Sequence, residues 1–208
     1  MTSSPPGAPG RRSRSAALIL SLALLVGGLG ILALVVHFTM PRGGQMATAP
    51  SAIGGAFQLT DQSGKPFTEQ DLAGKPSLIF FGFTHCPDIC PTKLFEMTQV
   101  LDRMGADAAK VNTVFITVDP ARDTRELMAA YMGSFHPTIR GLTGTDEQVQ
   151  AAMRAYRAYG RKVPLEGGNY TMDHTVFVYL MDKTGRFVAT FDVARDPAAA
   201  VQELRRYL

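Results

Sequence analysis

Cysteine is scarce in this sequence: 2 of its 208 residues are cysteine and 4 are histidine. A four-cysteine site, a common arrangement for structural zinc, is therefore excluded. Both cysteines fall in one short run, Thr84-His85-Cys86-Pro87-Asp88-Ile89-Cys90-Pro91. Two thiols this close together, in a protein without another thiol, require an explanation beyond packing.

Acidic residues are absent from residues 1–44, a stretch that contains Arg11, Arg12, Arg14 and Arg42. Removing these four from the 21 basic residues of the chain leaves 17 basic against 18 acidic residues for the remainder, a net charge of −1. The overall charge of +3 therefore belongs to the N-terminal region. It gives no reason to expect a nucleic acid as a partner.

A charge-free apolar run covers residues 16–38. As a helix it would be about 34 Å long, enough to cross the hydrocarbon core, and it exceeds the run of about 7–15 residues in a signal peptide. We predict a basic cytoplasmic tail (1–15), a transmembrane anchor (16–38), a flexible linker (39–55) and one globular domain (56–208). The alternative is a cleaved signal peptide, for which Ala47-Thr48-Ala49 imitates a cleavage site.

The charge distribution predicts the orientation of this anchor. The arginines precede the apolar run, so the positive-inside rule places the N-terminus in the cytoplasm and the domain outside. The expected location is the bacterial cytoplasmic membrane, crossed once, with the domain on the periplasmic, extracytoplasmic side.

The domain shows an α/β pattern around the cysteines. Residues 78–83 form a continuous apolar run of strand length, which indicates a central strand covered on both faces. After the cysteines, apolar residues recur every three or four positions, as in a helix. Val111 to Val118 indicates the next strand, so a βαβ unit with two parallel strands is predicted.

The remaining elements complete an α/β sandwich around a mixed sheet. Helices are predicted after a cap at Asp123 or Thr124, after the capping box of Thr145 with Gln148, and after Asp196-Pro197. The other expected features are a first hairpin over 56–68, a turn at Gly141–Gly144, a long loop over 160–173, a strand over 174–181, and its hairpin partner over 186–191.

The position of Pro91 predicts where the thiols lie. Proline disfavours helical geometry in the residue before it and is favoured as the first helical residue. We therefore expect Cys90 at or near the N-cap and Cys86 in the loop ahead of it. The positive end of the helix dipole would then lower a thiol pKa. A thiolate attacks disulfides and binds metals, and a pair of thiolates suits Cu(I).

Imidazole is the natural third ligand for copper in such a site. His37 lies in the apolar run, His85 is expected to point away from Cys86, and His136 is expected to be structural. His174 opens a predicted strand, and strand ends at the same edge of a sheet converge. His174 is therefore the best candidate for a third ligand, although a lone histidine is more often structural.

Four segments resemble, in order, motifs of the Sco/SenC/PrrC family. The cysteine run is similar to its T-x-C-P-D-x-C-P signature, and residues 119–124 are similar to its D-P-x-R-D-T segment. Gly141-Leu-Thr-Gly144 and Asp173-His174-Thr175 match two further motifs. The resemblance covers about residues 55–208.

This resemblance implies a thioredoxin-like fold and delivery of copper, as Cu(I) or Cu(II), to the Cu(A) site of cytochrome c oxidase. It implies Cys86, Cys90 and His174 as the copper ligands. It also places Asp119 near the site, as a candidate residue that orients a metal ligand without binding the metal itself. The implied partners are the Cu(A)-bearing oxidase subunit and, as a candidate donor, another copper chaperone.

Three alternatives use the same cysteines. A thiol–disulfide oxidoreductase would reduce the cysteines of the Cu(A) site with Cys86 and Cys90 as its redox pair, without need of His174. The motif of a general oxidoreductase is usually C-x-x-C, which argues mildly against this. A peroxidase would be expected to show T-x-x-C, whereas Thr84 stands two residues before Cys86. A purely structural disulfide would close too short a loop to stabilise the fold appreciably.

Overall fold

The computed structural model divides the chain into two compact units, Met1–Ala47 and Thr48–Leu208. The residues it describes are 19, 22, 24–32, 34–35 and 53–208. The predicted tail (1–15) lies outside the described residues, as does the linker (39–55) except for its last three positions. The anchor segment (16–38) is described in part, and its described residues are helical with exposed side chains. Among all described residues, none of the helices has the length and apolar character needed to cross a membrane.

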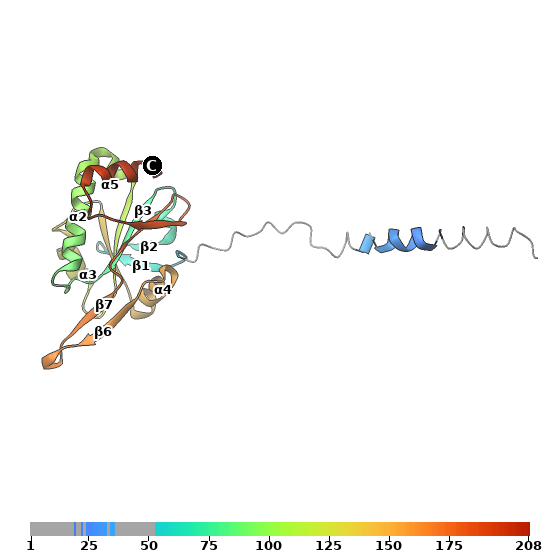
Figure 1. Cartoon of the computed structure of the whole chain (residues 1–208). Coiled ribbons are helices and arrows are strands. Elements are labelled where there is room, and N and C mark those ends of the chain that lie inside the picture. Colours follow the sequence, from blue (N-terminus) through green and yellow to red (C-terminus); the bar gives the residue numbers. More distant parts are fainter. Residues whose placement is uncertain (1–18, 20–21, 23, 33, 36–52) are drawn as a thin grey trace, which may run out of the picture. The chain divides into compact units, whose positions relative to one another are not determined.

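The second unit is built on a mixed sheet of seven strands in the order β2-β1-β5-β4-β3-β8-β9 (Figure 1). Its strands are β1 (Gln58–Asp61), β2 (Pro66–Thr68), β3 (Ser77–Gly82), β4 (Asn112–Thr117), β5 (Ile139–Thr143), β8 (Val178–Met181) and β9 (Phe187–Phe191). The central strands β3, β4 and β5 are parallel to one another, and the other pairs are antiparallel. A separate two-stranded sheet joins β6 (Gly160–Pro164) to β7 (Tyr170–His174) and projects from the body.

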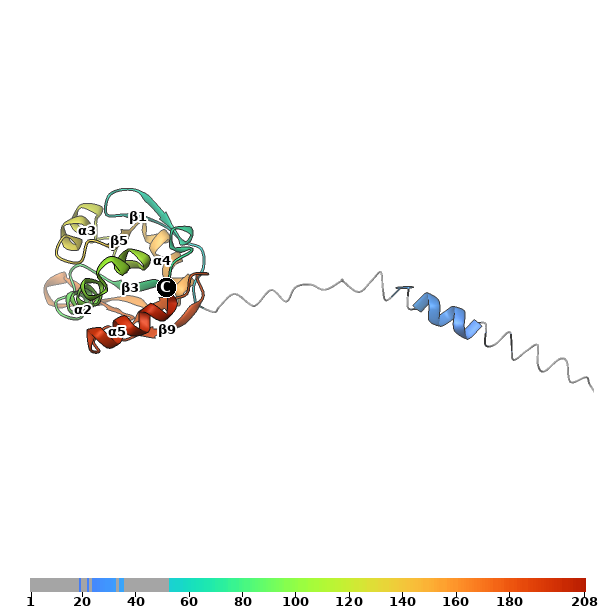
Figure 2. The ribbon, with the colours of Figure 1, turned by 90° about the horizontal axis from the view of Figure 1, so that it is seen from above.

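Helices cover both faces of the large sheet. They are α2 (Ile89–Met104), α3 (Arg125–Met132), α4 (Asp146–Tyr156) and α5 (Pro197–Leu204), with 3-10 turns at Glu69–Leu72, Gly105–Lys110, Glu166–Gly168 and Arg205–Tyr207. On one face α2 and α5 lie side by side (Figure 2), and the ring of Tyr131 on α3 contacts Phe115. On the other face Tyr156 of α4 contacts Phe81. Strand β3 is buried along its whole length, so both its ends are fixed by the core.

Several local predictions are confirmed. The hairpin β1–β2, the parallel βαβ unit and the hairpin β8–β9 form as expected. Thr124 caps α3 through the backbone N–H of Leu127. Thr145 and Gln148 form the predicted capping box at α4. These features were predictable because each depends on neighbouring residues and on a periodic apolar pattern.

Three predictions are wrong. The expected turn at Gly141–Gly144 is largely strand β5, and Gly141 is needed there for close packing: a Cβ on it would lie 2.5 Å from Cγ of Met128 on α3. The expected loop over 160–173 contains the hairpin β6–β7, none of whose residues is buried and which lacks an apolar alternation. His174 does not open a strand over 174–181; it ends β7, and β8 begins at Val178.

Candidate metal centre

The two cysteines lie at the junction of β3 and α2, at the carboxyl end of the central strand. Helix α2 begins at Ile89 with Asp88 as its N-cap, so Cys90 lies in the first helical turn, near the N-cap as predicted. The preference of proline for the first helical position does not decide the start, because Pro91 is tolerated anywhere in the first turn, where backbone N–H groups lack helical acceptors. Cys86 lies in the preceding loop, as predicted.

The structure brings the three predicted ligands together. Sγ of Cys86, Sγ of Cys90 and a ring nitrogen of His174 all lie within 4.8 Å of one another. Nε2 of His174 is 3.5 Å from Sγ of Cys90, and the backbone N–H of Cys90 donates to Sγ of Cys86 over 3.4 Å. Both cysteines are free thiols. Two soft sulfur donors and one imidazole at this separation can close on a single small ion.

The local hydrogen bond of His174 fixes which nitrogen faces the thiols. Its Nδ1 lies 2.8 Å from the carbonyl oxygen of Thr175. A carbonyl oxygen can only accept, so Nδ1 carries the proton and Nε2 presents its lone pair to the sulfur atoms. The edge of the ring contacts Phe83, with centroids 5.6 Å apart, and Phe80 packs nearby. The imidazole is thus oriented before a metal binds.

The two thiols have different surroundings. Cys90 is completely buried, whereas Cys86 is partly exposed. The hydrogen bond from the Cys90 thiol lowers the pKa of Cys86 far below its usual value, although burial opposes this. The same hydrogen bond and burial raise the pKa of Cys90. The pair therefore shares one proton, held by Cys90, and carries its negative charge on Cys86.

A buried carboxyl group braces the cysteine loop from behind. Asp123 is fully buried and accepts hydrogen bonds from the backbone N–H and hydroxyl of Thr84, over 3.1 and 2.7 Å, and from the hydroxyl of Thr117, over 2.6 Å. Its own carbonyl oxygen accepts from the hydroxyl of Thr143. Asp123 thus joins the carboxyl ends of β3, β4 and β5. From the sequence, Asp123 was predicted only as one of two candidate helix caps; the threonines that end the neighbouring strands were the signal for this larger role.

Asp119 also lies behind the site, but its side chain is bound to other residues. It accepts a hydrogen bond from the hydroxyl of Tyr170 over 2.9 Å and pairs with the guanidinium of Arg122. The hydrogen-bond partner of the imidazole is the Thr175 carbonyl, not Asp119. Any support that Asp119 gives to the ligands therefore acts through Arg122 and Tyr170.

The other histidines have separate surroundings. His85 is exposed, with Nδ1 3.1 Å from the hydroxyl of Thr84 and 3.6 Å from Asp123. His136 bonds to Thr138 over 2.8 Å and faces Asp102. His37 lies outside the described residues.

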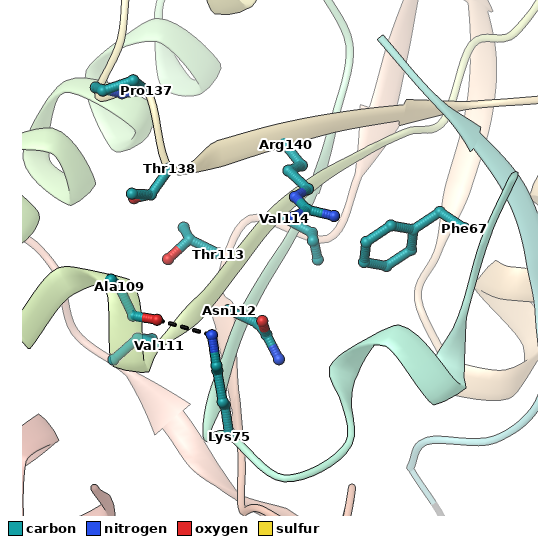
Figure 3. A pocket seen from close by; sticks show the side chains of 10 residues that line it. All are labelled: Phe67, Lys75, Ala109, Val111, Asn112, Thr113, Val114, Pro137, Thr138 and Arg140. Carbon is teal, nitrogen blue, oxygen red and sulfur yellow. Dashed lines mark hydrogen bonds between the residues drawn. The ribbon is translucent and has the colours of Figure 1, made fainter. Parts of the chain in front are cut away.

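A cavity of about 300 Å³ lies at the opposite edge of the sheet (Figure 3). Its lining includes Lys75, Thr113 and Arg140, and it is bounded by the loops that lead into β4 and β5. The Nζ of Lys75 donates to the carbonyl oxygen of Ala109 over 2.8 Å at its rim. None of the predicted site residues lines this cavity, so the candidate metal centre is a surface site at the carboxyl edge.

The fold and the site together define a thioredoxin-like protein with two thiols and one imidazole at the turn after the central strand. The chain belongs to the SCO1/SenC family, whose family model matches residues 45–208.

Relatives span prokaryotes and mitochondria. The chain is similar to the mitochondrial protein SCO2 of Saccharomyces cerevisiae, with 40% identity over 161 residues, which covers 76% of this chain and 53% of that protein. It is 39% identical over 178 residues to the SCO2-like protein RP587 of Rickettsia prowazekii, covering 84% of this chain and 87% of that protein. The chain thus spans about half the length of the yeast relative but most of the bacterial one.

Solved structures share the fold of the second unit. ScoI of Bradyrhizobium japonicum, described with copper bound, has a TM-score of 0.74 and 55% identity, and the match covers 76% of this chain and 100% of that one. Yeast Sco1, also described with copper bound, has a TM-score of 0.68 and 40% identity, covering 76% and 88%.

Proposed function

We propose that this protein is a copper metallochaperone that binds copper through Cys86, Cys90 and His174 and helps to assemble the Cu(A) site of cytochrome c oxidase. The observation that carries the proposal is the convergence of two sulfur atoms and an imidazole nitrogen within 4.8 Å. The protein acts by binding and transfer, without turnover.

The chemistry of the donors supports copper over other metals. Thiolates are soft ligands that favour Cu(I), and an added imidazole suits both Cu(I) and Cu(II). Structural zinc would require a fourth protein ligand, and the cluster among the described residues has three donors. The relatives from Bradyrhizobium japonicum and yeast that are described with copper bound also support this choice.

The shared ligand chemistry and the family resemblance support the proposal that cytochrome c oxidase is the recipient of the copper. The Cu(A)-bearing subunit of cytochrome c oxidase would receive the metal at the partly exposed sulfur of Cys86, and another copper chaperone is the candidate donor. Partial exposure of Cys86 and His174 allows an incoming ligand to reach the metal without unfolding of the domain.

Membrane attachment is part of the proposal. The charge-free run 16–38 and the arginines before it support a single-pass anchor in the bacterial cytoplasmic membrane. The domain would then face the periplasm.

Anaerobic titration of the reduced full-length protein in detergent with Cu(I) and Cu(II) tests this function. The wild type is expected to bind one copper per chain and to show thiolate-to-Cu(II) absorption. His174→Ala should lose that absorption, and its affinity should fall by more than the about 10–100-fold typical of losing a residue that only supports a ligand. His136→Ala is the matched control and should bind as the wild type does. Equal stoichiometry and spectra in wild type and His174→Ala would refute the assignment.

A thiol–disulfide oxidoreductase is the second candidate function, favoured by two free thiols of which one is partly exposed and has a lowered pKa. In this role Cys86 attacks a disulfide of the oxidase subunit, Cys90 resolves the mixed disulfide, and this protein leaves oxidised. Restoration of oxidase assembly by His174→Ala without added copper would favour this function. Failure of that variant to restore assembly would favour the chaperone.

A further inference from the structure

His174 reaches the thiols from an element outside the large sheet. It is the last residue of β7, which pairs only with β6 in the two-stranded sheet. The loop and helix that carry the thiols follow directly from β3, which is fixed by the core, but β7 has no neighbour in the seven-stranded sheet. Contacts between β7 and the body must therefore set the distance between the imidazole and the sulfur atoms.

One attachment of β7 lies directly beside the ligand. The backbone N–H of Thr175 donates to the carbonyl oxygen of Tyr159 over 3.0 Å, and the N–H of Tyr159 donates to the hydroxyl of Thr175 over 2.9 Å. Both residues flank the β6–β7 hairpin, since Tyr159 immediately precedes β6 and Thr175 immediately follows β7. These two hydrogen bonds therefore join the two ends of the hairpin to each other and do not fix the hairpin to the cysteine turn.

The second attachment joins β7 to the loop between β4 and α3, and we call it the Arg122 cluster: Arg122, Asp119 and Tyr170. Nη1 of Arg122 donates to the carbonyl oxygen of Tyr170 over 2.9 Å, while its Nε donates to Asp119. The Tyr170 hydroxyl donates to the other oxygen of Asp119 over 2.9 Å. The guanidinium also lies 3.8 Å from the centre of the Tyr170 ring. Arg122, Asp119 and Tyr170 thus each contact the other two, and Tyr170 connects the cluster to β7.

The Arg122 cluster is connected to the ligands through one aromatic residue. The guanidinium of Arg122 lies 5.8 Å from the ring centre of Phe83, and the imidazole of His174 lies 5.6 Å from the same ring. Phe83 is buried and stands three residues before Cys86. Arg122 therefore holds β7 at Tyr170, four residues before His174, and packs on the same ring as the imidazole.

We propose that Arg122 is a positioning residue that holds β7, and with it His174, at the distance from Cys86 and Cys90 that copper requires. This inference rests on the proposed copper-binding function. It also assigns Asp119 a role: its two oxygens orient the guanidinium and the tyrosine hydroxyl, so it acts on the ligand through them.

The chemistry of arginine suits this task. Its planar fork donates in two directions at once and stacks on an aromatic face, whereas lysine has a single ammonium group. Asp119 is buried and the Arg122 side chain is mostly covered, so these contacts are less weakened by water than a surface ion pair would be. Loss of the guanidinium would leave the carboxyl of Asp119 with one donor fewer and would free the backbone at Tyr170.

Copper binding by reduced full-length Arg122→Gln, in detergent, tests the inference. Cu(II) affinity is expected to fall about 10–100-fold, as for other residues that support a metal ligand. The imidazole nitrogen signal in pulsed electron paramagnetic resonance should weaken, while Cu(I) affinity, which depends mainly on the two sulfur atoms, should change less. Arg122→Lys should not restore the signal, because one ammonium cannot replace the fork. Full restoration by lysine, or a wild-type signal in Arg122→Gln, would overturn the proposal.

Lys162→Gln is the matched control. Lys162 also places a cation over the Tyr170 ring, at 4.7 Å, but it lies on β6 within the hairpin. Its removal should leave the copper spectra unchanged, and an effect equal to that of Arg122→Gln would show that only stacking on Tyr170 matters. Tyr170→Leu provides a second test if Arg122→Gln does not fold, and it should weaken the same nitrogen signal; an unchanged signal there would also overturn the proposal.

A double-mutant cycle separates positioning from general destabilisation. If Arg122 acts through His174, then Arg122→Gln should cause no further loss of copper affinity in a His174→Ala background. Additive losses would overturn the proposal. Wild-type protein that binds no copper would instead refute the proposed function, whereas binding by the wild type with equal binding by Arg122→Gln would refute only this inference.

Discussion

Nε2 of His174 lies 3.5 Å from Sγ of Cys90, although 84 positions of sequence separate the two residues. One ligand comes from the helix that follows the central strand and the other from the last residue of a hairpin strand outside the main sheet. The site therefore forms only when the β6–β7 hairpin is held at a fixed position relative to the body of the domain. That position decides whether the protein offers copper two ligands or three.

The unequal thiols predict an unusual pH dependence of alkylation. Because the pKa of Cys86 is lowered, its thiolate persists as the pH falls. We expect the rate of its reaction with iodoacetamide to stay nearly constant between about pH 5 and 8, where an ordinary thiol with a pKa of about 8.5 loses about tenfold per pH unit. Mass spectrometry after timed alkylation of the reduced apo-protein identifies which cysteine reacts.

The Cys90→Ala variant is the control for this experiment. The main cause of the lowered pKa is the hydrogen bond from the Cys90 thiol, so its removal should move the pKa of Cys86 upward and restore a steep pH dependence. A steep profile in the wild type, or rapid labelling of the buried Cys90, would contradict the prediction.

The close packing around Gly82 connects the end of β3 directly to the thiol of Cys90. A Cβ at this last residue of β3 would lie 2.6 Å from the Phe115 ring and 2.7 Å from Sγ of Cys90. Gly82→Ala should therefore displace Cys90, lower the free energy of unfolding by about 1–3 kcal/mol and alter the copper spectrum. Chemical denaturation and Cu(II) absorption measure the two effects.

Gly141→Ala is the matched variant, because its new Cβ would crowd Met128 and Met132 of α3, away from the thiols. It should destabilise the domain while leaving the copper spectrum unchanged. If both variants change the spectrum equally, the effect of Gly82→Ala is general and not local.

The buried carboxyl of Asp123 predicts a large loss of stability on its removal. Asp123→Ala would leave the backbone N–H of Thr84 and the hydroxyls of Thr84 and Thr117 without their acceptor. We expect the free energy of unfolding to fall by about 2–4 kcal/mol, since buried donors without partners are costly. Glu166→Ala, at an exposed turn, should change it by less than about 0.5 kcal/mol. Equal urea midpoints for the two variants would contradict the bracing role.

The N-terminal segment predicts firm membrane attachment. The full-length chain should remain in the membrane pellet after an alkaline carbonate wash, whereas a chain of residues 45–208 should appear in the soluble fraction. The arginines before the apolar run predict that an added protease reaches the domain from the periplasmic side. Release by carbonate, or a mature N-terminus beyond residue 38, would indicate a cleaved signal peptide instead.

The elements that carry the thiols could be predicted because their signals are local. The apolar run of β3, the helical spacing of α2 and the capping residues of α3 and α4 each lie within a few positions of one another. His174 was preferred because it was expected to open a strand at the same sheet edge as the cysteine turn, and that reason was wrong, since it ends β7 outside the large sheet. Its correct selection therefore rested on the resemblance of Asp173-His174-Thr175 to a family motif.

The parts that could not be predicted depend on contacts between distant segments. Gly141 favours a turn in isolation, but it lies in β5 because α3 requires the space that a side chain would fill. The strands β6 and β7 contain no buried residue and give no apolar alternation. The bracing role of Asp123 depends on three strand ends that meet only after folding.

The start of α2 at Ile89 has a consequence for metal exchange. Because Cys90 lies inside the first helical turn it is completely buried, while Cys86 in the loop remains partly open to its surroundings. An incoming ligand from another protein can approach Cys86 and His174 without rearrangement, but it cannot reach Cys90. We therefore expect a bound ion to leave in a fixed order: Cys86 and His174 would release it first, and the buried sulfur of Cys90 would release it last.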